Sequence, residues 1–268
     1  MNETPDSDAG LRVAVDGAGV ATVTMDRPHI HNAFDDALIE AMTRTFRELD
    51  ARDDVRAVVL AAEGRSFSAG ADLNWMRRMA GYTEAENLED ARALAAMVEA
   101  LDSLSKPTVA KVQGAAMGGG VGLVAACDIA VAAEDVMFAL SEVRLGLIPA
   151  AISPFVTRAM GGRAARRYML TGERFDAAEA HRLGLIHDVV LGNDLDDAVT
   201  DMLRALLKAG PGAQAVCKRL IRTVEEAPLA PALHEHTAGE IARLRVSPEG
   251  QEGLAAFLEK RKPAFVKD

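Results

Sequence analysis

Four glycines occupy five positions within the segment AAMGGGVGLVAACD, residues 115–128. A glycine inside a helix costs about 1 kcal/mol relative to alanine, so this placement requires a reason. The apolar run at 107–112 predicts a strand before the glycines, and the residues at 121–127 predict a helix after them. A glycine loop at a helix N-terminus can direct free backbone N–H groups at a ligand. The segment indicates either such a loop or close packing of the helix on the strand.

Phosphate is one ligand of such loops, but neither nucleotide-binding pattern is present. No Lys-Ser/Thr pair follows the glycines, and their spacing lacks the dinucleotide-binding context.

A second small-residue loop, Ala69-Gly70-Ala71, follows another predicted buried strand. Two such loops after neighbouring strands can each present one N–H to a single oxygen. This arrangement, an oxyanion hole, lowers a barrier by roughly 3–4 kcal/mol per donor and favours acyl chemistry through an enolate.

A single carboxylate, Glu142, stands in the apolar segment FALSEVRLGLIPA. An isolated glutamate is usually a solvated surface residue. Here the neighbours Leu140, Leu145 and Leu147 predict burial, which would raise the pKa of Glu142 toward the range that suits general acid–base catalysis. Glu142 is therefore the candidate acid/base group.

The elements around these residues alternate between strands and helices. In order, we expect a hairpin of strands at 11–15 and 20–25, a helix at 35–49, strands at 55–62 and 107–112, and C-terminal helices at 163–171, 176–183, 194–208, 211–226, 231–245 and 248–261. Such alternation over 268 residues predicts an α/β core built from right-handed crossovers, followed by a helical C-terminal part.

Composition excludes several classes of protein. The net charge of −10 argues against nucleic-acid binding, which requires a basic face. The two cysteines, Cys127 and Cys217, form no disulfide framework, and the spacing of His29 and His31 suggests no metal site. The acidic N-terminus lacks the apolar core of a signal peptide, and no apolar run reaches membrane-spanning length. We therefore expect a soluble, cytoplasmic protein without membrane or nucleic-acid partners.

Three motifs, SFSAGADL, QGAAMGGGVGLVAACDIAVA and SEVRLGLIP, together resemble the crotonase (enoyl-CoA hydratase/isomerase) superfamily. The segments DRPHIHNAF (26–34) and AAFLEKRKPAF (255–265) extend the resemblance over nearly the whole chain. It implies an α/β crotonase-like spiral of ββα units and a helical region that builds trimers, often paired into hexamers. The implied division is a flexible tail over 1–10, a spiral core over 11–200 and an oligomerisation region over 201–268. The implied ligand is an acyl-CoA thioester, with no separate cofactor and no metal, since coenzyme A is part of the substrate.

The resemblance also implies roles for individual residues. The oxyanion donors would be the N–H groups of Ala71 and Gly119, and Glu142 would be the acid/base. Gly122 stands where typical two-glutamate hydratases carry their other glutamate, so we expect extra room in the pocket there. Contact with coenzyme A or the acyl group is implied for His29, Ile30, His31, Ala69, Gly70, Asp72, Leu73 and Gly118, and, from an adjacent subunit, for Phe257 and Lys260.

One carboxylate can support either hydration or 3-enoyl to 2-enoyl isomerisation, and the motifs alone leave both open. The segments SFSAGADLNWMRRMAGYTEAENLEDARALA and SEVRLGLIPAAISPFV are similar to the bacterial methylglutaconyl-CoA hydratase branch and its isohexenylglutaconyl-CoA relatives. This favours hydration of 3-methylglutaconyl-CoA or a related branched enoyl-CoA, with Arg77, Arg78 or Arg144 as partner for a distal carboxylate. The third possibility is a member that binds acyl-CoA without turnover.

Overall fold

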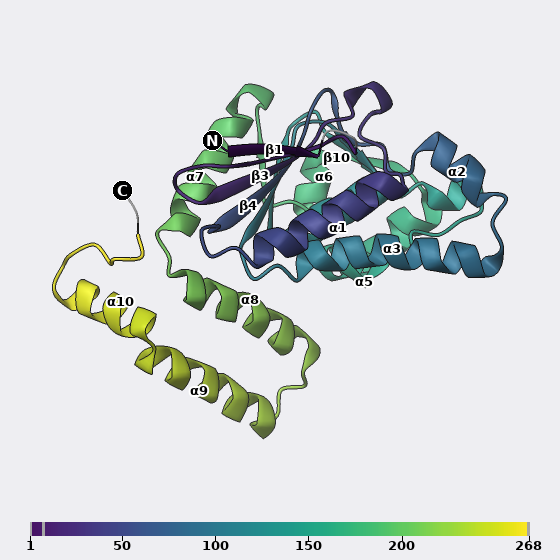
Figure 1. The fold of residues 1–268 in the computed structure, drawn as a ribbon. Helices are drawn as coiled ribbons and strands as arrows, with labels where there is room; N and C mark the ends of the chain where they lie inside the picture. Colours follow the sequence, from purple (N-terminus) through teal and green to yellow (C-terminus); the bar gives the residue numbers. More distant parts are fainter. Residues whose placement is uncertain (1, 7–8, 267–268) are drawn as a thin grey trace.

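Two β-sheets form the centre of the computed structural model, which describes residues 2–6 and 9–266 (Figure 1). The seven-stranded sheet has the order β1 (Asn2–Asp6), β2 (Leu11–Val15), β3 (Val20–Met25), β4 (Ala57–Ala62), β6 (Thr108–Val112), β8 (Ile129–Ala133) and β11 (Asp188–Val190). The four-stranded sheet has the order β10 (Arg174–Asp176), β9 (Met137–Ala139), β7 (Ala115–Met117) and β5 (Ser66–Ser68).

Helices connect and cover the sheets. They are α1 (Asp36–Asp50), α2 (Leu73–Met79), α3 (Glu84–Asp102), α4 (Gly119–Ala126), α5 (Ser153–Thr171), α6 (Ala177–Arg182), α7 (Leu195–Leu207), α8 (Pro211–Glu226), α9 (Pro231–Val246) and α10 (Pro248–Leu258). Short 3₁₀ turns are η1 (Pro28–Ile30), η2 (Glu142–Leu145) and η3 (Gly192–Asp194).

The chain repeats one path three times. It runs through one strand of each sheet and then a helix, as β4–β5–α2–α3, β6–β7–α4 and β8–β9–η2–α5. Strands β4, β6 and β8 are parallel neighbours in the large sheet, and β5, β7 and β9 are parallel neighbours in the small one. This repeat confirms the predicted crotonase-like spiral of ββα units.

Strand β4 is buried on both faces, which explains why its sequence is apolar without alternation. Val58 and Leu60 belong to the main core, whereas Val59 and Ala61 pack with α7 on the opposite face. Parallel strands covered on both faces need apolar residues at successive positions. Helix α7 lies on one side of the large sheet and α1 and α3 on the other (Figure 1).

Several boundaries differ from the sequence predictions. Residues 2–6, expected within a loose tail, form β1, which pairs with the otherwise open edge of β2 in the register Asp6↔Leu11. Helix α7 continues to Leu207 and packs on the large sheet, so the core extends past residue 200. The segment after 152, expected to be helical, also contains the short strands β10 and β11. Helix α4 begins inside the predicted glycine loop, at Gly119.

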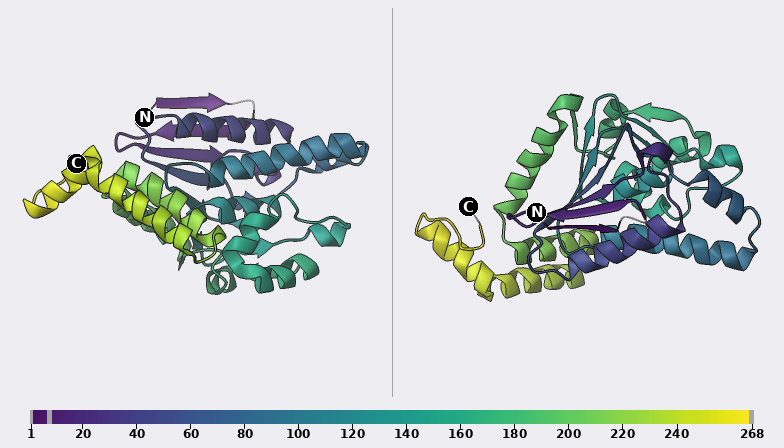
Figure 2. Two further views of the ribbon diagram at one scale, coloured as in Figure 1. Left: turned by 90° about the horizontal axis from the view of Figure 1, so that it is seen from below. Right: turned by 45° about the horizontal axis from the view of Figure 1, so that its top comes forward.

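Helices α8–α10 form a C-terminal arm that projects from the body in all views (Figures 1 and 2). Lys218 and Arg222 of α8 attach it to the core through ion pairs of 2.7 and 2.8 Å with Asp128 and Asp102. The arm exposes Ile221, Val224, Leu229, Ile241, Val246, Leu254, Phe257 and Leu258. An oligomerisation role for this arm stays a prediction. Within residues 9–266, no helix is both long and apolar enough to cross a membrane.

Candidate active site

Phe34 brings the two predicted oxyanion loops together. Its backbone accepts a hydrogen bond from Asp72 N–H and donates one to Gly70 O, both at 2.7 Å, so it brackets Ala71. Its ring lies against Gly119, where an added Cβ would be 2.5 Å from Cε2 of Phe34. The Cβ position of Gly70 is 3.7 Å from the backbone nitrogen of Gly119. The two loops are therefore in direct contact.

The N–H groups of Ala71 and Gly119 remain available for a ligand. Within the described part of the chain, neither group donates a hydrogen bond. Gly119 is the first residue of α4, and a helix N-terminus carries unpaired N–H groups and partial positive charge. This geometry supports the prediction that these two groups are oxyanion donors.

Asn32 fixes the loop that carries His29, Ile30 and His31. It is fully buried, and its Nδ2 donates to the carbonyls of Glu63 at 2.9 Å and Ser66 at 2.8 Å. Its Oδ1 accepts from Arg27 N–H at 2.8 Å, and Ser68 Oγ donates to its carbonyl. The sequence reasoning placed Asn32 in the loop expected along coenzyme A, but it did not single out Phe34 or Ser68, which lie in DRPHIHNAF and SFSAGADL. The result is that residues 29–31 run beside the loop that contains Ala69 and Gly70.

Glu142 begins η2 and points its carboxyl group at the glycine loop. Its Oε1 lies 2.7 Å from where a Cβ on Gly118 would be, and the positive φ of Gly118 (50°) also favours glycine there. Its Oε2 is buried and has no hydrogen-bond partner among the described residues. Burial raises the pKa of Glu142. Of the three leucines expected to bury it, Leu140 is buried, whereas Leu145 and Leu147 are 62% and 54% exposed. On the side of α4, Gly118 lies against its carboxyl group.

The space beside Gly122 is not empty, contrary to the prediction. A Cβ added to Gly122 would lie 2.6 Å from Cβ of Ile152 and closer still to its Cγ2. Ile152 is 2% exposed and caps the N-terminus of α5. The missing side chain at position 122 is thus replaced by the side chain of Ile152, which the sequence reasoning did not identify.

Of the other predicted contact residues, Asp72 caps a helix, whereas Ala69, Leu73 and His31 lie along or beside the loop that precedes it. Asp72 caps α2, since its carboxylate accepts from the N–H groups of Asn74 at 2.8 Å and Trp75 at 3.0 Å. Ala69 and Leu73 are exposed beside it, the latter at 67%. His31 Nδ1 is 3.0 Å from Ser66 Oγ, so the histidine lies along the same loop. These positions are compatible with the predicted contacts to coenzyme A, which stay predictions.

Residues 16–268 match the enoyl-CoA hydratase/isomerase family. The chain belongs to this family. The enoyl-CoA hydratase ACTT6 of Alternaria alternata is 36% identical over 247 residues, which cover 90% of this chain and 78% of that protein. A putative enoyl-CoA hydratase of Thermus thermophilus is 32% identical over 254 residues, covering 94% and 100%. The crystal structure of an enoyl-CoA hydratase from Shewanella pealeana has a TM-score of 0.92 and 49% identity, and covers 95% of each chain.

The family match confirms the crotonase resemblance and the prediction of a hydratase-type enzyme. Crotonase-family enzymes act on acyl-CoA substrates and are commonly oligomeric. Phe257, predicted to contact coenzyme A of an adjacent subunit, is 80% exposed on α10, and Lys260 follows that helix. The arm that carries both residues points away from the body of its own chain (Figures 1 and 2).

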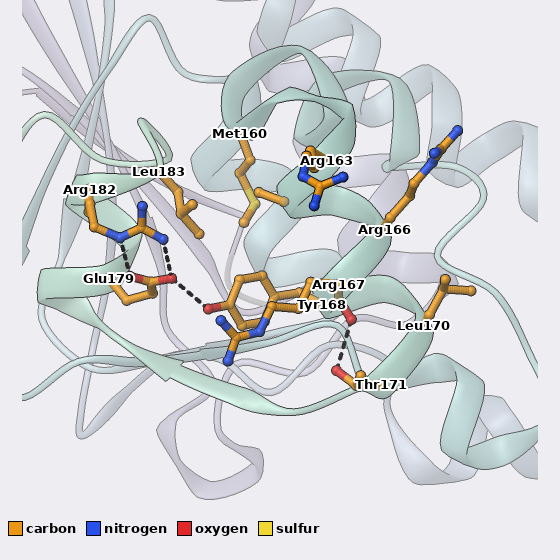
Figure 3. Close-up of a pocket in the computed structure, with 11 residues that line it drawn as sticks. Met160, Arg163, Arg166, Arg167, Tyr168, Leu170, Thr171, Glu179, Arg182 and Leu183 are labelled. Carbon is orange, nitrogen blue, oxygen red and sulfur yellow. Dashed lines mark hydrogen bonds and ion pairs between the residues drawn. The ribbon is translucent and has the colours of Figure 1, made fainter.

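A cavity of about 720 Å³ lies elsewhere in this crotonase, between α5 and α6 (Figure 3). It is lined by Met160, Arg163, Ala164, Arg166, Arg167, Tyr168, Leu170, Thr171, Glu179, Arg182 and Leu183. Glu179 accepts from Tyr168 Oη at 2.8 Å and from Arg182 at 2.6 and 2.7 Å. Neither Glu142 nor the oxyanion loops contribute to it, so chemistry rather than volume locates the candidate site.

Metal-ligand clusters and the buried thiol of Cys127 are the remaining candidate groups at described positions. No cluster of three or more His, Cys, Asp or Glu side chains suited to a metal ion occurs there. Cys127 is buried, and burial raises the pKa of its thiol, which suits a structural residue rather than a nucleophile.

Proposed function

We propose that this enzyme adds water to the double bond of a branched enoyl-CoA, with 3-methylglutaconyl-CoA or a close relative as substrate. The observation that carries the proposal is the Glu142 carboxyl group, whose Oε2 is buried and unpartnered among the described residues beside Gly118. Two free N–H groups, on Ala71 and Gly119, lie on loops in contact with the same glycine turn. One acid/base group and two oxyanion donors suffice for hydration.

The proposed reaction proceeds in two proton transfers. The Glu142 carboxylate removes a proton from water as the water oxygen bonds to the β-carbon. The electron pair of the double bond moves onto the thioester oxygen, where the N–H groups of Ala71 and Gly119 stabilise the enolate. The enolate then collapses, and its α-carbon takes the proton from Glu142, which restores the carboxylate. A raised pKa suits Glu142 to both transfers.

A distal carboxylate on the substrate needs a cationic partner. Arg78 is paired with Asp36 at 2.6 Å, and Arg144 donates toward Thr171 O. Arg77 of α2 is exposed and donates to the neutral Asn74 side chain, with no carboxylate partner among the described residues. Arg77 is therefore the proposed partner of the distal carboxylate.

The test offers the enzyme 3-methylglutaconyl-CoA, crotonyl-CoA and a 3-enoyl-CoA. It follows product masses together with the ultraviolet absorbance of the conjugated 2-enoyl thioester. A gain of one water, fastest on the branched substrate, supports the proposal. A 2-enoyl product of unchanged mass assigns isomerisation instead, which the single carboxylate also permits. Binding of all three esters without turnover contradicts both. An Arg77→Gln variant, with exposed Arg92→Gln as control, should lose the preference for the distal carboxylate.

A further inference from the structure

The packing of Ile152 on Gly122 closes one side of α4 near the catalytic carboxyl. Gly118 is the N-cap of α4, and its carbonyl accepts a hydrogen bond from Gly122 N–H at 3.3 Å, so the two glycines stand one turn apart. A Cβ on Gly118 would meet Oε1 of Glu142, and a Cβ on Gly122 would meet Ile152. Glu142 and Ile152 therefore approach the start of α4 at two positions that are four residues apart.

The chain connects these two residues over a short path. Glu142 begins η2, and Ile152 immediately precedes α5, which packs against both α4 and η2. Ile152 is 2% exposed, and its Cβ and Cγ2 lie within 2.6 Å of where a Cβ on Gly122 would be, so its side chain occupies that position. The β-branched side chain is also stiff at χ1 and holds a fixed shape.

We propose that Ile152 determines substrate specificity by limiting the size of the group on the β-carbon. This inference rests on the proposed hydration, in which the β-carbon must approach the water held by Glu142. A substituent on that carbon extends toward α4, where Ile152 ends the available space. The same side chain keeps a second acid and further water away from Glu142, so both proton transfers stay with one residue.

Trimming Ile152 should enlarge the acceptable substituent. For Ile152→Ala, we expect the ratio of kcat/KM for a 3-ethyl enoyl-CoA over its 3-methyl analogue to rise by roughly tenfold, the discrimination that one methylene supplies in an apolar pocket. Ile152→Val removes less volume and should raise the ratio by a smaller factor. The matched control is Ile186→Ala, because Ile186 is 1% exposed in the same core and precedes β11.

The outcomes separate this inference from the proposed function. If wild-type enzyme hydrates branched esters and only the Ile152 variants shift the ratio, the inference is supported. An unchanged ratio in Ile152→Val and Ile152→Ala, or an equal shift in Ile186→Ala, overturns it while hydration stands. Absence of hydration by the wild-type enzyme overturns the proposed function itself. Thermal melts of the three variants establish that each is folded, and Ile152→Val keeps the test decisive if the alanine variant unfolds.

Discussion

Replacement of Glu142 by glutamine should abolish turnover and stabilise the fold. Glutamine keeps the shape of the side chain but can neither accept nor return a proton. The proposed reaction assigns both proton transfers to Glu142, and Ile152 occupies the position from which a side chain at 122 could assist. Position 122 therefore offers no second acid that could substitute for Glu142 in the proposed reaction.

The expected loss of activity follows from that double role. General acid–base catalysis contributes about 10²–10⁴-fold. With both transfers lost together, kcat should fall by about 10³–10⁴-fold, which is about 4–5 kcal/mol of barrier. Binding of a saturated acyl-CoA, which cannot be hydrated, should remain, since the N–H groups of Ala71 and Gly119 are untouched.

The stability effect has the opposite sign. Burial raises the pKa of Glu142, so the folded state binds its proton more tightly than the unfolded state. Between the unfolded pKa and the raised folded pKa, the native state holds more protons, and the free energy of unfolding falls as pH rises through this window. Glutamine carries no charge, so Glu142→Gln should be more stable than wild type above the window. The difference should vanish below the unfolded pKa, where Glu142 is neutral in both states.

Urea unfolding at neutral and acid pH, together with turnover measured by product mass, tests both effects on one variant. Exposed Glu40→Gln is the control and should change neither activity nor the pH dependence of stability. The wild-type kcat/KM should also fall as pH drops through the raised pKa of Glu142, because the base becomes protonated. Residual activity above a tenth of wild type in Glu142→Gln, or no gain in stability at neutral pH, would refute the assignment.

Three further substitutions probe the framework of the site. Gly122→Ala should cost about 1–3 kcal/mol of stability by overpacking against Ile152, whereas Gly162→Ala, with nothing near its Cβ position, should be neutral or stabilising in the same thermal melts. Asn32→Ala leaves the Arg27 N–H without its acceptor and should lower the free energy of unfolding by about 3 kcal/mol. Weaker acyl-CoA binding, measured by calorimetry, should accompany that loss. Arg56→Met removes hydrogen bonds of 2.8 Å to the carbonyls of Ala209 and Phe265; faster limited proteolysis at 208–211 should result, and an unchanged cleavage rate would contradict the role of Arg56 in holding the arm.

Local sequence signals predicted the elements whose ends depend on nearby residues. The stretch Thr83-Glu84-Ala85-Glu86 has the spacing of a capping box. The box forms at the start of α3: Thr83 Oγ1 accepts from Glu86 N–H, and the Glu86 carboxylate accepts from Thr83 N–H. Asp35 caps α1 by accepting from Leu38 N–H. Three-residue strands such as β5 and β7 have too few positions to show alternation, so they left no pattern to read. They are specified by their partners in the small sheet.

The parts of the site that sequence reasoning missed depend on contacts between distant segments. The glycine at position 122 indicates that a side chain is absent, but not that Ile152, thirty residues later, takes its place. Of the leucines expected to bury Glu142, Leu140 is buried but Leu145 and Leu147 are exposed. The contact of its carboxyl group with Gly118 was not predicted. Residue types along one segment cannot reveal which neighbour the spiral brings to it.

The glycine run reflects crowding on several sides of the start of α4. A Cβ at each of its four glycines would meet a different neighbour: Glu142 at Gly118, Phe34 at Gly119, Ser68 at Gly120 and Ile152 at Gly122. These neighbours come from four separate segments, and each must approach closely for the site to form. Phe34 aligns the loop of Ala71, Glu142 supplies the carboxyl group, and Ile152 limits the space beside it. The glycine run is therefore both a candidate ligand-binding loop and a site of close backbone packing. The packing that excludes side chains also leaves the N–H of Gly119 free beside the acid.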